Sequence, residues 1–117
     1  MNQFDSAILD QNLRAIDKIY ETISIYKSIL IVNEPHMVQM YADLLSKRDY
    51  PVAVFATAYM FNRDEARMLV LSHNEVNHFE EHHSNGIIDM KNVTTILYVD
   101  PIDTHFPEFE NIEEFFL

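Results

Sequence analysis

The residues best equipped for chemistry lie between positions 73 and 83, in the stretch HNEVNHFEEHH. On a helix, His78 and His82 would lie one turn apart on the same face, a spacing that can bind zinc. The string HFEEH also fits a zinc-peptidase pattern in which two histidines bind the metal and a glutamate acts as the base. That activity needs a further ligand and a much larger fold. We therefore predict exposed histidines and no metal site, with His78 and His82 as the candidate ligands if a metal does bind.

The end of the chain, FPEFENIEEFFL, combines aromatic and acidic side chains in an acidic aromatic tail, residues 104–117. On a helix, its apolar residues recur at intervals of three and four and would form one side. Such a helix would dock in a groove of a partner protein or pack on the domain's own sheet. The predicted partner-binding residues are Phe106, Phe109, Ile112, Phe115 and Phe116.

Size and charge limit the class of protein. The chain has 117 residues, which suits a single domain over residues 1–117, and its net charge is −11, with 19 acidic and 8 basic residues. This charge opposes binding to a nucleic-acid backbone, which needs neutralising cations, and to anionic membranes. We expect a protein partner rather than directly bound RNA.

Glycine and cysteine usage exclude two further kinds of site. The one glycine, Gly86, cannot supply the glycine-rich loops that hold phosphates in nucleotide sites. With no cysteine, disulfides and thiolate metal sites are impossible. No apolar stretch approaches the roughly 20 residues that span a bilayer. We predict an intracellular, cytoplasmic protein with no cofactor and no enzyme activity.

Short apolar runs alternate with helical patterns along the chain. KSILIVN, PVAVFA, MLVLS and VTTILYV read as strands, the first of them buried on both faces, while residues 5–26 and EPHMVQMYADLLSKRDY show helical spacing. This alternation predicts an α/β domain with a mainly parallel central sheet and helices on both faces. The residues expected on the central strands are Ile29, Ile31, Val52, Val54, Leu69, Leu71, Ile96 and Tyr98.

Several of these segments, in the same order, resemble the second RecA-like domain of DEAD-box RNA helicases. AIDKIYETISIYKSILIVN stands where the family has a helix followed by the strand IIFVNT, and ADLLSKRDYPVAV stands where it has LL...GYPV. The family's later GIDxxNVxxVINYDLP keeps its frame here through Gly86, Asp89, Asn92, Val93, Thr94, Tyr98, Asp100 and Pro101. The resemblance covers roughly residues 13–103 and implies a RecA-like fold.

The departures from this family affect its chemistry. Its ATDxxARG motif is replaced by LSHNEVNHFEEHHSNG, in which Ser72, His73 and Asn85 take the places of the threonine, the aspartate and the arginine. Its arginine-bearing HRxGRxxR motif should follow Pro101, but no arginine follows there. Arginines of that kind stabilise the transferring phosphoryl group. The resemblance therefore implies a degenerate, non-catalytic domain, as in Tudor–helicase scaffold proteins of the Yb type, acting within an RNA-processing or RNA-granule assembly.

Two alternatives remain open. ILIVNEPHMVQMYADLLSKRDYPV also resembles the start of response-regulator receivers, but Asn33-Glu34 is an altered acid pair, and His73 and Asn74 stand where the phosphoacceptor aspartate belongs. An ATP-independent RNA-binding remnant would need a basic stripe, for which the sequence offers few residues.

Asp100 and Asp103 read as turn residues. An exposed sheet edge also leaves a homodimer open.

Overall fold

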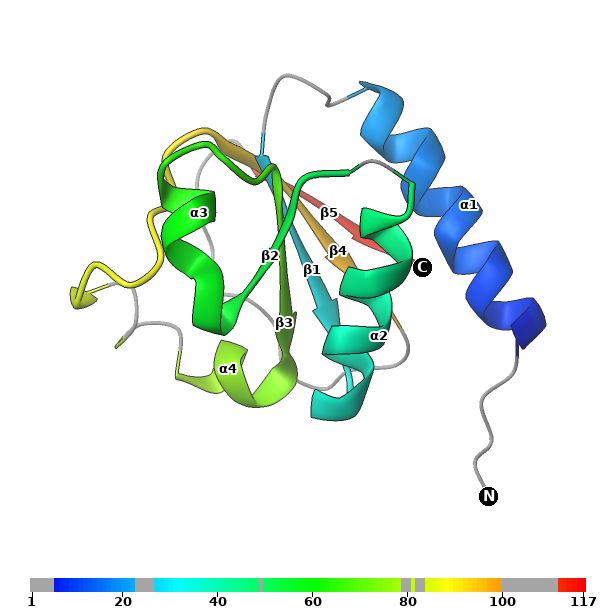
Figure 1. Cartoon of the computed structure of the whole chain (residues 1–117), viewed down its shortest axis with the longest axis horizontal. Coiled ribbons are helices and arrows are strands. Elements are labelled where there is room, and N and C mark those ends of the chain that lie inside the picture. The colour runs from blue at the N-terminus through cyan, green and yellow to red at the C-terminus, as the bar shows by residue number, and fades with distance from the viewer. Residues whose placement is uncertain (1–5, 23–26, 49, 79–80, 82–83, 100–111) are drawn as a thin grey trace.

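Five parallel strands form one sheet in the order β2-β3-β1-β4-β5 in the computed structural model, which describes residues 6–22, 27–48, 50–78, 81, 84–99 and 112–117 (Figure 1). The elements in chain order are α1 (Ser6–Thr22), β1 (Lys27–Val32), α2 (Pro35–Ser46), β2 (Val52–Val54), the 3-10 helix η1 (Phe55–Thr57), α3 (Ala58–Asn62), β3 (Met68–Ser72), α4 (His73–Asn77), β4 (Val93–Tyr98) and β5 (Glu113–Phe116). The predicted α/β class with a parallel sheet is confirmed, and the architecture is consistent with a RecA-like or a Rossmann-like fold.

The centre of the sheet is built from apolar runs that the sequence already marks as strands. Every residue of β1 and β3 is buried, and β1 lies between β3 and β4 with Ile29 beside Leu69 on one side and Ile96 on the other. Strands covered on both faces need no polar alternation, which is why residues 29–32 of β1 and 68–71 of β3 are continuously apolar. The eight residues expected on the central strands all lie on β1, β2, β3 and β4.

Two separate cores lie on the two faces of the sheet. Because side chains alternate along a strand, Ile29 and Ile31 pack with α3 and α4, while Leu30 and Val32 pack with α1 and α2. Figure 1 shows α1 and α2 to the right of the sheet and α3 and α4 to the left. Helices on both faces, as predicted, are confirmed.

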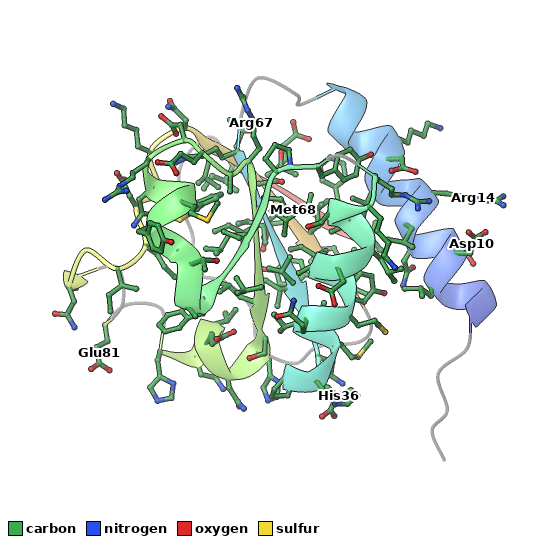
Figure 2. All side chains as sticks on the ribbon, in the orientation of Figure 1. Asp10, Arg14, His36, Arg67, Met68 and Glu81 are labelled. Atoms are coloured by element: carbon green, nitrogen blue, oxygen red, sulfur yellow. The ribbon has the colours of Figure 1, made fainter. Side chains whose placement is uncertain are left out.

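Side chains in Figure 2 separate into these interiors and a charged exterior. Met68 lies among the packed elements and is fully buried. By contrast, Asp10 and Arg14 project from the outer side of α1, where they form an exposed ion pair of 2.9 Å between Oδ2 and Nη2. The helical pattern of α1 thus has the expected inner side, with Leu13 and Ile16 buried.

The strand predicted over PVAVFA is shorter than expected. β2 ends at Val54, and Phe55 begins η1, because the Thr57 hydroxyl bonds the backbone of Val54: the Val54 N–H donates to Thr57 Oγ1 at 3.0 Å. β2 is also an edge strand, so Val52 and Val54 are half-buried rather than buried.

The tail forms a strand at its end. Residues Glu113–Phe116 make β5, which extends the sheet beside β4 with Leu97 opposite Phe115. The helix considered for the tail is wrong for these residues, because they pair with the free edge of β4. The rest of the tail, residues 104–111, lies outside the described residues, as do Asp100 and Asp103.

Candidate functional site

A change of direction in the chain defines the most favourable place for a ligand. From β1 the chain passes through α2 to the outer strand β2, and from β2 it returns through α3, on the opposite face, to β3. From β3 it continues through α4, again on the α3 side, and crosses β1 to reach β4. The chain therefore leaves the neighbouring strands β1 and β3 toward opposite faces. Parallel α/β sheets bind ligands outside the carboxyl ends of such strands.

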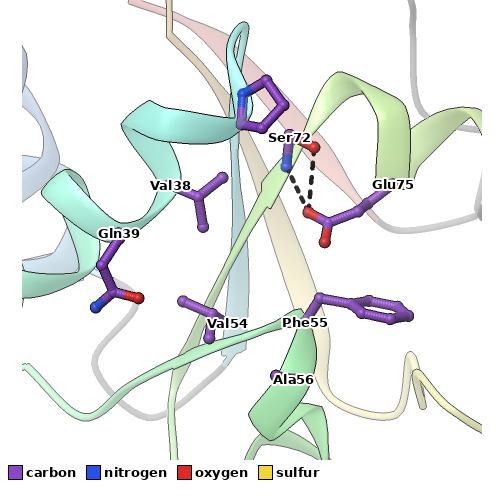
Figure 3. A pocket seen from close by; sticks show the side chains of 8 residues that line it. Val38, Gln39, Val54, Phe55, Ala56, Ser72 and Glu75 are labelled. Carbon is purple, nitrogen blue, oxygen red and sulfur yellow. Dashed lines mark hydrogen bonds between the residues drawn. The ribbon is translucent and has the colours of Figure 1, made fainter.

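A pocket of about 290 Å³ opens beside this point, between the beginning of α2, the beginning of α4 and the end of β2 (Figure 3). We call it the switch-point crevice. Its lining residues are Pro35, Val38, Gln39, Val54, Phe55, Ala56, Ser72 and Glu75. Five of these eight carry apolar side chains, and none carries a basic one. The walls are therefore mainly hydrophobic.

The first turn of α2 forms one wall. Pro35 occupies the first helical position and Glu34 is the N-cap, in an extended conformation. A proline is favourable there because its missing N–H has no partner within a helix anyway. The amide of Met37 donates to the carbonyl oxygen of Glu34 at 3.0 Å. Few amides of this helix start therefore remain for a ligand.

The opposite wall comes from the end of β3 and the beginning of α4. The amide of Ser72 donates to Glu75 Oε1 at 2.9 Å, and the Ser72 hydroxyl donates to the same oxygen at 3.2 Å. Serine followed three residues later by glutamate is the sequence signature of a helix start in which the glutamate side chain reaches back to the cap. This arrangement fixes the Glu75 carboxylate over the crevice.

A histidine links the segments that follow β1 and β3. The Nδ1–H of His73 donates to the carbonyl oxygen of Asn33, which follows β1. Asn33 belongs to the predicted altered acid pair, and His73 stands where the helicase and receiver patterns each place an aspartate. The two residues thus join the segments after β1 and β3 to each other.

The crevice is poorly suited to phosphate or metal chemistry. Glu75 is its single acidic residue, and the amide of its single glutamine, Gln39, donates to Asp43 Oδ1 at 2.8 Å. Magnesium and calcium sites assemble several oxygen ligands, and phosphate sites need cations or free amides. Within the described part of the chain, no group of three histidine, cysteine, aspartate or glutamate side chains could hold a metal ion.

Of the two candidate zinc ligands in the histidine-rich stretch, His78 lies among the described residues. α4 ends at Asn77, so His78 is already the C-cap, exposed, with its Nδ1 3.0 Å from the carbonyl oxygen of Asn74. His82 lies outside the described residues. His78 therefore lies just beyond α4, and its pairing with His82 stays a prediction.

The predicted partner-binding residues of the tail are divided between interior and surface. Ile112 and Phe115 are half-buried and pack against the two cores, whereas Phe116 is 65% exposed and stacks on Tyr98 with ring centroids 4.8 Å apart. Phe106 and Phe109 lie outside the described residues. β5 and β2 form opposite edges of the sheet, so the described end of the tail and the crevice are separate surfaces.

A smaller hollow of about 150 Å³ lies at the other end of the strands, lined by Lys27, Asp64, Ala66, Arg67 and Asn92. Its buried cation is already paired. Lys27 Nζ donates to the carbonyl oxygen of Phe61 at 2.9 Å and lies 3.1 Å from Asp64 Oδ1. The polar contacts of Lys27 in this hollow therefore stabilise the fold.

Sequence reasoning missed the crevice, although signals for it were present. The serine–glutamate helix start after MLVLS predicts the position of Glu75, and Pro35 marks the other helix start. Neither signal says that the two helix starts face each other, because this depends on the order of the strands.

Comparison with known proteins finds no matching family model, no matching curated protein and no matching solved structure. The described residues include no helix long and apolar enough to cross a membrane. The class of protein therefore rests on the fold: an α/β domain with an all-parallel sheet and a largely apolar, acidic crevice at its switch point.

Proposed function

We propose that this chain is a non-catalytic, helicase-like RecA domain that binds another protein, and that the switch-point crevice is a binding site. The observation that carries the proposal is the lining of the crevice. The place where parallel α/β domains bind their ligands has hydrophobic walls and a carboxylate, with no basic side chain among its lining residues. RNA-processing or RNA-granule assemblies are the setting that the helicase resemblance suggests.

Nucleotide chemistry has little support at this site. A nucleoside triphosphate brings several negative charges, and Glu75 would repel them. The glycines that allow a backbone to approach phosphates closely are missing from β1, β3 and the residues that follow them. The size of the crevice also lies at the lower limit of small-molecule sites, which suits one or two protein side chains.

The order of the strands favours the helicase-like interpretation over the receiver alternative. Receivers have the flavodoxin-like order 2-1-3-4-5, in which the first strand lies beside the second. Here β3 separates β1 from β2. A phosphoacceptor aspartate is also missing from the end of β3, where His73 instead binds the Asn33 carbonyl.

Selection of peptides from a random phage library on the immobilised chain tests the proposal. We expect peptides whose binding is lost in Ala56→Trp, which fills the crevice from an exposed position, and retained in Gln11→Trp on the exposed side of α1. Thermal melting of both variants checks that they fold. Failure to select any peptide sensitive to Ala56→Trp would contradict the proposal.

A nucleotide and RNA titration separates the remaining alternatives. We expect no hydrolysis of ATP with Mg²⁺, and no change in the fluorescence anisotropy of labelled single-stranded RNA at low salt. Hydrolysis would refute the non-catalytic assignment. RNA binding that weakens as salt rises would favour the RNA-binding remnant.

A further inference from the structure

We propose that the switch-point crevice binds the side chain of an arginine or lysine from a basic segment of the partner protein. This inference rests on the proposed function and names the chemistry of the partner. The crevice joins a carboxylate to hydrophobic walls, and a long basic side chain has the matching combination of a charged head and an apolar stem.

The geometry of Glu75 provides the anionic end. Both of its hydrogen bonds, from the amide and hydroxyl of Ser72, are accepted by Oε1. Within the described part of the chain, no hydrogen bond or ion pair to Oε2 is found. In Figure 3 this second oxygen points away from Ser72, toward the side of the crevice formed by Phe55. Glu75 is therefore held in place by one oxygen and can accept from a ligand with the other.

The walls supply a surface for the methylene groups. Val38 projects from α2 toward Val54 of β2, and Phe55 follows on η1 (Figure 3). All three side chains are half-buried, so a ligand would remove further apolar area from water. A basic side chain lying along Val38 and Val54 can place its head at Glu75.

Helix starts usually favour anions, and the competing occupant is therefore a phosphate or carboxylate. Three features oppose it here. Pro35 has no N–H to donate, the Met37 amide already donates to the backbone carbonyl of Glu34, and the N-cap residue, Glu34, is itself acidic. A full charge at Glu75 outweighs the partial charge of the helix end.

The charge of the whole chain supports a basic partner. At −11, it attracts positively charged segments over a longer range than any single contact and repels a second copy of itself. Charge complementarity therefore favours a basic segment over a homodimer at this surface.

The test uses n-butylguanidinium, which reproduces the arginine side chain, titrated into the isotope-labelled chain and followed by NMR of the backbone amides. We expect saturable shifts centred on Val38, Phe55 and Glu75. n-Pentanol tests the apolar walls alone, and inorganic phosphate tests the anion alternative.

Glu75→Gln is the decisive variant. A glutamine keeps an oxygen for the Ser72 amide and hydroxyl but removes the charge, and we expect n-butylguanidinium to bind about tenfold more weakly. The matched control is Glu81→Gln, which removes the same charge from an exposed side chain that does not line the crevice (Figure 2). This control should bind as the parent chain does.

The outcomes separate this inference from the proposed function. Equal binding to the parent chain and Glu75→Gln, preferential binding of phosphate, or no crevice shifts with n-butylguanidinium would each overturn the basic-anchor inference. If crevice-dependent peptides are nevertheless selected from the phage library, the proposed function stands. Selected peptides that are rich in arginine or lysine, and whose binding is lost in Glu75→Gln, would support both the proposed function and the basic-anchor inference.

Discussion

Replacing Lys27 by methionine should destabilise the domain, although it removes a charge from a buried position. The Lys27 side chain is 4% exposed at the beginning of β1, and its Nζ donates to the carbonyl oxygen of Phe61 at 2.9 Å. The same ammonium lies 4.5 Å from the centroid of the Phe61 ring. Methionine keeps the apolar stem of the side chain but has no donor, so the Phe61 carbonyl loses its charged partner and keeps the backbone amide of Asp64, at 3.2 Å.

The expected magnitude follows from these contacts. A hydrogen bond from a charged donor such as the Lys27 ammonium contributes about 1.5–3 kcal/mol. The ion pair with Asp64 adds less than about 1 kcal/mol, since the Asp64 side chain is 61% exposed. Removing the desolvation cost of a buried ammonium offsets part of the loss. We therefore expect Lys27→Met to lower the free energy of unfolding by about 2 kcal/mol.

Urea unfolding followed by circular dichroism measures this change, which corresponds to a decrease in the midpoint of about 1 M. Asp64→Asn is the matched variant, because asparagine tolerates the positive φ of 63° at this position and changes only the charge. It should cost less than about 1 kcal/mol. Equal losses for the two variants, or no loss for Lys27→Met, would refute the assignment of the stabilisation to the Phe61 carbonyl.

Changes at four further positions test the fold. Ile31→Asp should prevent folding, because it places an unpaired carboxylate on a fully buried strand; a cooperative melt of this variant would contradict the position of β1. Ser28→Ala should raise the unfolding free energy by about 1 kcal/mol, since Ser28 Oγ is buried without a partner in the described part of the chain. Ser72→Ala, which loses a hydroxyl that binds Glu75, should lower the unfolding free energy by about 1 kcal/mol in the same urea experiment. If Ser28→Ala and Ser72→Ala changed the unfolding free energy in the same direction, the roles assigned to the two hydroxyls would be refuted. Asn92 has a φ of 67°, so Asn92→Ala should lower the melting temperature while Asn92→Gly leaves it nearly unchanged; similar melting of the two would argue against the left-handed backbone.

Glu75 illustrates how far the candidate site could be predicted. The histidine-rich stretch drew attention to residues 73–83 because imidazoles and carboxylates are chemically versatile, yet the contribution of this stretch to the crevice is a helix-capping glutamate. The apolar residues opposite it, Val38 and Val54, read as ordinary core positions. Only their meeting at one edge of the sheet turns them into a site.

The sequence by itself determined the local elements. The mainly apolar runs of β1, β3 and β4 and the helical spacing of α1 and α2 follow from the burial and the periods of strand and helix, since each pattern states which faces must be buried. The absence of glycine-rich loops likewise follows from composition alone.

Tertiary structure alone decided the pairing of these elements. β5 forms because β4 offers an open edge to a short segment whose own pattern also fits a helix. Lys27 is buried because the Phe61 carbonyl, 34 residues away in the chain, lies within reach of its ammonium. Strand order, ion pairing and the crevice depend on contacts between distant segments, and periodicity within a segment carries no information about its partner.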